Sequence, residues 1–133
     1  MILVDSNVLM YASGASHPNK AASLSFLNRV AREEVQAAID AEVLQEIIHR
    51  YSSLRRWTEG RDLYDFARGL FAQILPITAD VTDRAKHLVD ADNRIAARDA
   101  VHAAVVMEYN LEGICTFDRD FDRIRGCRRV AVR

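Results

Sequence analysis

Residues 1–8 have the sequence Met1-Ile-Leu-Val-Asp-Ser-Asn-Val8, in which a short apolar run ends at a carboxylate. Four apolar residues are too few for a helix and fit a buried strand. A carboxylate at the end of such a strand is costly to bury without a partner. We therefore expect Asp5 to lie in a polar site at the end of a strand, with a divalent metal ion as its partner.

Beyond this stretch, the apolar pattern alternates between strand-like and helix-like segments. Short strands are expected at residues 35–39, 74–77, 113–116 and 129–132. Amphipathic or buried helices are expected at residues 19–31, 41–54, 58–73, 79–89 and 99–109. Ser6 or Asn7 is expected to cap a short helical turn after the first strand. Asp40 is expected to cap the helix that begins at residue 41. The alternation predicts an α/β fold with three layers, α/β/α, and a central, mainly parallel sheet flanked by helices.

The length and composition are those of an ordinary globular protein. A chain of 133 residues fits one domain spanning residues 1–133. No apolar run is long enough to cross a bilayer and no signal segment precedes Met1, so we expect no membrane partner. Cys115 and Cys127 are too few for a disulfide framework, which predicts buried thiols and a cytoplasmic location.

Carboxylates recur where a parallel sheet would place a binding site, outside the carboxyl ends of its strands. Asp5 and Asp118 follow expected strands, and Asp99 opens an expected helix. Glu46 lies just beyond the apolar stripe of its helix, which suits a cleft wall. Three of these acids also have an ordinary structural explanation: Asp99 as a helix cap, Asp118 in an Asx turn and Glu46 as a surface residue. Asp5 is harder to explain in this way, because an acid at the end of a strand points into the crevice.

A cluster of these acids would need a cation, because neighbouring carboxylates raise one another's pKa. Hard oxygen ligands favour Mg²⁺ or Mn²⁺, with Asp5 and Asp99 as first-choice direct ligands. One ion or two could offset charge on phosphoryl oxygens during hydrolysis. The net charge of −1 is unlike the basic footprint of many nucleic-acid binders. Contacts to phosphate groups would come from arginines near the cleft, and the candidates are Arg98, Arg119 and Arg123.

Four motifs, in this order, resemble those of the PIN-domain family, and the VapC-type toxins are the branch they resemble most. The motifs are Met1 to Val8, Glu46 in its helix, Arg98-Asp-Ala-Val-His-Ala-Ala104 and Thr116-Phe-Asp-Arg-Asp-Phe121. The resemblance covers essentially the whole chain. It implies a magnesium- or manganese-dependent endoribonuclease that acts as the toxin of a toxin–antitoxin pair, with housekeeping RNA processing as the alternative.

The resemblance also assigns roles to residues and partners. It implies an acidic metal and catalytic site made of Asp5, Glu46, Asp99 and Asp118, with Asp120 as a candidate fifth acid. Asn7 and Thr116 would orient carboxylates through hydrogen bonds. The implied partners are an RNA substrate, a cognate antitoxin and a second copy of the chain in a homodimer. Apolar residues available for such contacts are Leu54, Trp57, Leu63, Tyr64 and Phe66, with core packing as the alternative.

Other functional classes remain open from the sequence. Glu46-x-x-His49 and Asp99-x-x-His102 have the spacing of a di-iron carboxylate centre. Against it, such a centre needs further glutamates, His49 lies opposite its apolar stripe, and His102 is typical of a core histidine. A haloacid-dehalogenase-like phosphatase would need an aspartate where Asn7 stands. A non-catalytic PIN-like binding module is the remaining alternative.

Overall fold

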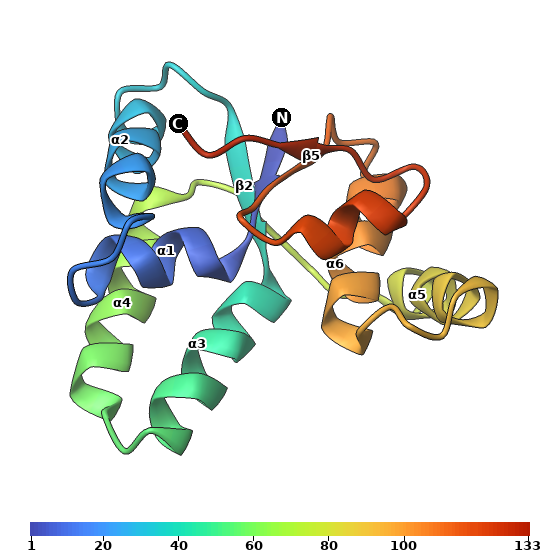
Figure 1. Ribbon diagram of the computed structural model, residues 1–133, viewed down its shortest axis with the longest axis horizontal. Coiled ribbons are helices and arrows are strands. Elements are labelled where there is room, and N and C mark those ends of the chain that lie inside the picture. The colour runs from blue at the N-terminus through green and yellow to red at the C-terminus, as the bar shows by residue number, and fades with distance from the viewer.

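The computed structural model describes residues 1–133, and five short strands form one parallel sheet in the order β3-β2-β1-β4-β5 (Figure 1). The elements are β1 (Ile2–Val4), α1 (Ser6–Ser13), α2 (Lys20–Ala31), β2 (Ala37–Asp40), α3 (Ala41–Ser53), α4 (Trp57–Leu70), β3 (Ile74–Leu75), α5 (Ala79–Ala91), α6 (Ala97–Glu108), β4 (Ile114–Cys115), the 3₁₀ helix η1 (Arg119–Arg123) and β5 (Arg129–Val130). None of these helices is long and apolar enough to pass through a bilayer.

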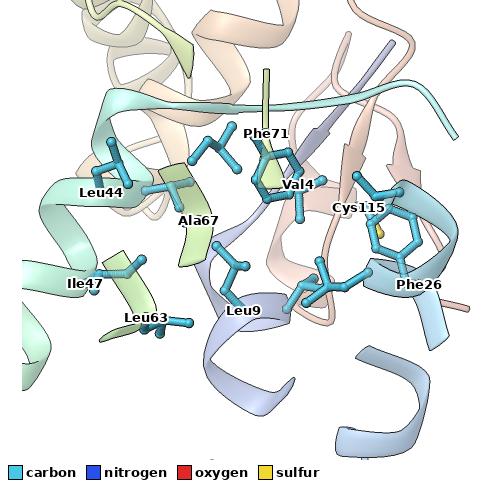
Figure 2. Close-up of a cluster of buried hydrophobic side chains, with 14 of the residues drawn as sticks. Val4, Leu9, Phe26, Leu44, Ile47, Leu63, Ala67, Phe71 and Cys115 are labelled. Carbon is cyan, nitrogen blue, oxygen red and sulfur yellow. The ribbon is translucent and has the colours of Figure 1, made fainter. Parts of the chain in front are cut away.

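The sheet separates two hydrophobic cores, since successive strand residues point to opposite faces. Val4 belongs to the core covered by α1 to α4, whereas Leu3 belongs to the core covered by α5 and α6 (Figure 2). On the neighbouring strands, Ile39 and Cys115 belong to the core with Val4, and Ala38 and Ile114 belong to the core with Leu3. The predicted α/β/α layers are therefore confirmed, with α5 and α6 on one side of the sheet and α1, α2 and α4 on the other (Figure 1).

The same alternation positions three polar side chains at the carboxyl ends of the central strands. Asp5, Asp40 and Thr116 each come one residue after a side chain of the core beneath α1 to α4. They therefore point toward the α6 side of the sheet. In this position Asp5 and Asp40 both come within 4 Å of the His102 ring on α6.

Several helix boundaries differ from expectation by one to three residues, and three of these differences have a structural reason or bear on the site. Neither Ser6 nor Asn7 caps α1, because the helix begins at Ser6 and Asp5 is its N-cap residue. α6 begins at Ala97 with Ala96 as its N-cap, so Asp99 lies inside the first turn and caps nothing. α4 ends at Leu70, because Phe71 adopts an extended conformation and buries its ring in the core.

The predicted cap of α3 is confirmed. The Val43 N–H donates to Asp40 Oδ1 at 3.0 Å, and Asp40 is fully buried. Both cysteines are buried free thiols, as expected, and burial raises the pKa of each to about 12.

Candidate active site

A cleft of about 640 Å³ lies at the carboxyl ends of β1 and β4, and it brings together the four acids singled out in the sequence. Asp5 reaches it from the end of β1, Glu46 from α3, Asp99 from α6 and Asp118 from the segment after β4. The four carboxylates are separated by up to 113 residues along the chain. Their convergence follows from the parallel sheet, whose strand ends share one edge.

The inner half of the cleft is lined by Asp5 and Glu46 and backed by His102, and the ligand atoms of these three residues all lie within 4.8 Å of one another. His102 Nε2 is 2.6 Å from Glu46 Oε1 and 3.9 Å from Asp5 Oδ1. Ser6 Oγ donates to the other Glu46 oxygen. Glu46 is thus held on both oxygens and lines the cleft, as its position beside the apolar stripe suggested, and at 8% exposure it is not the surface residue of the alternative explanation.

Thr116 orients Asp5 through a hydrogen bond of 2.7 Å from its hydroxyl to Asp5 Oδ2. The Thr116 oxygen also accepts bonds from Asn7 Nδ2 at 3.1 Å and from the Asp118 N–H at 3.0 Å. A hydroxyl has one proton and two lone pairs. Because Asn7 Nδ2 and the Asp118 N–H both donate to the Thr116 oxygen, the single hydroxyl proton points at Asp5 and fixes the orientation of its carboxylate.

The outer half of the cleft is a second group of acids, Asp99, Asp118 and Asp120, with oxygens also within 4.8 Å of one another. Asp118 Oδ1 accepts the Asp120 N–H at 2.9 Å, which is the Asx turn considered from the sequence. Asp120 is exposed, lies 3.8 Å from Arg123 and does not line the cleft. Asp120, the candidate fifth acid, therefore lies at the rim of the cleft, next to Asp99 and Asp118.

The pKa shifts reflect this division of the site. Burial raises the pKa of Asp5. Burial, followed by the charges of Asp118 and Asp5, raises the pKa of Asp99 to about 6. Burial also disfavours charge on Glu46 and on His102. At Glu46 the hydrogen bond and charge of His102 outweigh burial and lower the pKa. At His102 the charge of Asp40, followed by the hydrogen bonds to Asp40 and Glu46, outweighs burial and raises the pKa well above its usual value.

A divalent cation fits this arrangement. Asp99 and Asp118 face each other without a compensating base between them, and burial of Asp5 adds a third carboxylate that is costly to ionise. A cation held by Asp5, Asp99 and Asp118 would remove that cost. The donors are all hard oxygens, as Mg²⁺, Mn²⁺ and Ca²⁺ prefer.

The arginines are arranged differently from expectation. Arg98 lines the cleft as predicted, but Arg119 and Arg123, the first and last residues of η1, do not. Arg50 and Arg56, from the end of α3 and the turn after it, line the cleft instead.

The two histidines of the di-iron alternative do not meet. His49 is exposed and belongs to neither acid cluster, whereas His102 is 1% exposed. The sequence analysis did not predict that His102 contacts Asp40 and Glu46. A signal was present: Asp40 follows β2 as Asp5 follows β1, and His102 is the one polar side chain on the inner face of an apolar helix.

The family model described as PIN domain matches residues 2–126 of the chain. The chain belongs to the PIN-domain family. Ribonuclease VapC13 of Mycobacterium tuberculosis is 37% identical to this PIN domain over 131 residues, which make up 98% of this chain and 100% of that protein. Ribonuclease VapC23 of the same organism is 30% identical over 118 residues, covering 89% and 93%.

Solved structures share the fold of this PIN domain at low sequence identity. VapBC2 from Rickettsia felis, bound to a DNA fragment from its promoter, has a TM-score of 0.79 and 19% identity, with 98% of both chains covered. Mycobacterium tuberculosis VapC20, described as a Sarcin-Ricin loop cleaving toxin, has a TM-score of 0.74 and 19% identity, covering 96% of this chain and 99% of that chain. Family membership leaves no place for the di-iron or phosphatase alternatives.

Proposed function

We propose that this chain is a divalent-cation-dependent endoribonuclease that hydrolyses RNA phosphodiester bonds as the toxin of a toxin–antitoxin pair. The observation that carries the proposal is the convergence of Asp5, Glu46, Asp99 and Asp118 on one cleft. The relatives named VapC ribonucleases support it, since two of them align with about nine-tenths or more of this chain.

Each acid has a distinct role in this proposal. Asp5, Asp99 and Asp118 would hold Mg²⁺ or Mn²⁺, and Thr116, which also accepts a hydrogen bond from Asn7, keeps Asp5 oriented for this role. Such an ion would supply positive charge to offset the negative charge that develops on the phosphoryl oxygens. Glu46 lies behind these ligands as the fourth catalytic acid, and Asp120 at the rim adds negative charge to the ion's surroundings.

The rest of the cleft suits a single-stranded or looped RNA. Arg98 and Arg50 line it and take part in no salt bridge within 4 Å, so both guanidinium groups are free for phosphates. Tyr11 and His17 stack on each other at 4.4 Å between ring centroids and also line the cleft. Unpaired bases stack on such aromatic side chains.

An apolar groove on the opposite side of α1 supports a protein partner. It has a volume of about 510 Å³ and lies between α1, α2 and α4, with Leu24 and Phe66 at its rim. Leu54, Trp57 and Phe66 are exposed as expected, whereas Leu63 is buried, so the expectation for that residue was wrong. We propose that an apolar segment of the antitoxin binds in this groove. We also propose that the chain forms a homodimer. Its proposed location is the cytoplasm.

The test is incubation of purified protein with total RNA and Mg²⁺ or Mn²⁺. Wild type and Asp83→Asn, which changes an exposed acid of α5, should give the same discrete fragments. Asp5→Asn, Asp99→Asn and EDTA should abolish them. Cleavage that persists in EDTA or in both variants would contradict the proposal, and an inactive wild type would favour the non-catalytic binding module.

Expression in a bacterial host separates the toxin role from housekeeping processing. Induction should arrest growth, and Asp5→Asn should remove the arrest. Active enzyme that leaves growth unchanged would favour RNA processing.

A further inference from the structure

His102 lies between two carboxylates that come from different elements. Its Nδ1 is 2.7 Å from Asp40 Oδ2, at the end of β2, and its Nε2 is 2.6 Å from Glu46 Oε1, on α3. Exposed fractions are 1% for His102, 0% for Asp40 and 8% for Glu46. Of the three, Glu46 alone lines the acid cleft.

These contacts leave the imidazole no freedom to rotate. An ionised carboxylate only accepts hydrogen bonds, so a ring held between two of them donates from both nitrogens. Asp40 is fixed in turn, because its other oxygen accepts the Val43 N–H at the start of α3. No buried side-chain nitrogen or oxygen in the chain lacks a hydrogen-bond partner.

We propose that Asp40 and His102 are positioning residues of the ribonuclease site: Asp40 fixes the His102 ring, and the ring fixes the Glu46 carboxylate behind the cation ligands. The inference rests on the proposed function and adds two residues that do not line the cleft. Ser6 holds the second Glu46 oxygen, so this carboxylate is held from both sides. Partners that orient the groups around a metal site contribute about 10- to 100-fold to affinity or activity.

The substitution Asp40→Ser breaks the contact with His102 but keeps the helix cap. Serine is a favoured N-cap residue, and its side chain is one bond shorter than needed to reach the ring. Asp40→Asn is the conservative counterpart: its amide oxygen can cap α3, and its amide nitrogen can donate to His102 Nδ1. The imidazole then still donates from Nε2 to Glu46.

A control that lowers stability away from the acid site is available on α5. Thr78 caps that helix by accepting the Val81 N–H at 3.2 Å, and it has no contact with the acid site. Thr78→Ala therefore removes an N-cap without touching Glu46.

The readouts are kcat and KM with an RNA substrate, Mn²⁺ affinity by titration calorimetry, and Tm. Asp40→Ser should lower kcat about 10- to 100-fold with little change in KM, and weaken Mn²⁺ binding about tenfold. Asp40→Asn should recover most of the loss, and Thr78→Ala should change Tm alone. The proposal is overturned if folded Asp40→Ser matches Thr78→Ala, or if Asp40→Asn is as impaired as Asp40→Ser.

Wild-type protein provides a test that does not depend on a variant folding. With uniformly ¹⁵N-labelled protein, Mg²⁺ should shift the His102 ring nitrogens with the same saturation curve as the Asp99 and Asp118 amides. Shifts at both amides with unmoved His102 nitrogens would overturn the positioning role alone. If neither amide shifts, no cation binds, and the proposed function fails together with the inference that rests on it.

Discussion

The two halves of the acid cleft contain similar side chains in opposite states. In the buried half, Asp5 and Glu46 accept hydrogen bonds from Thr116, Ser6 and His102. In the outer half, Asp99 and Asp118 face each other with no basic partner between them. A carboxylate cluster is stable only when something compensates its charge. In the buried half Glu46 is compensated by Ser6 and His102, whereas Asp5, whose pKa burial raises, depends on a bound cation together with the outer half.

The largest expected effect comes from removing a charge from the outer half. Asp99→Asn should lower kcat/KM for RNA cleavage by about 10³-fold or more. A bound ion contributes several kcal/mol of transition-state stabilisation, and each 1.36 kcal/mol is a factor of ten in rate. A steady-state cleavage assay at saturating Mg²⁺ measures it, with Asp83→Asn as control. A loss below tenfold would remove Asp99 from the cation site.

A smaller effect is expected in the buried half, where one of several partners is removed. Ser6→Ala leaves Glu46 with His102 alone on its oxygens and should lower kcat about tenfold. Ser23→Ala is the matched control, because Ser23 is also buried in a helix and donates only to the Asn19 carbonyl at 2.9 Å. Equal activity of the two variants would show that Ser6 does not support Glu46.

Stability should depend on pH through Asp99 in the outer half when no metal is present. The pKa of Asp99 rises from 3.8 to about 6 on folding, so the native state holds this proton more tightly than the unfolded state does. Stability from this group is complete below about pH 4 and is lost as pH rises through 6. The loss should be about 1 kcal/mol, discounted because the carboxylate is partly exposed.

Urea unfolding of metal-free protein at pH 4 and pH 7 measures this loss. Relative to wild type, Asp99→Asn should gain stability at pH 7 and not at pH 4, and Mg²⁺ should cancel the gain. A difference between the two proteins that is the same at both pH values would contradict the origin of the shift.

Features that depend on residues close together in the sequence could be predicted, whereas features that depend on contacts between distant residues could not. β1, the acid that ends it and the Asp40 cap depend on neighbouring residues, and each could be predicted from the sequence. The His102 contacts join residues 56 and 62 positions apart, so they required the register of β1 and β2. The end of α4 was missed for the same reason, because burial of Phe71 in the core decides it.

The smallest effect on catalysis is expected outside the cleft. Phe66 is 49% exposed at the apolar groove between α1, α2 and α4. Phe66→Glu should leave kcat/KM within about twofold, because surface substitutions away from a site are close to neutral. It should abolish co-purification with the co-expressed antitoxin. Arg61→Glu, an exposed change on the same helix outside the groove lining, is the control. Retained co-purification of Phe66→Glu would place the antitoxin elsewhere.

The most direct measurement is anomalous scattering from crystals soaked in Mn²⁺. The account predicts a peak bounded by the carboxylates of Asp5, Asp99 and Asp118, and its absence in crystals of Asp99→Asn. A peak between Glu46 and His102, or no peak in the cleft at a Mn²⁺ concentration that supports RNA cleavage, would contradict a cation site in the outer half of the cleft.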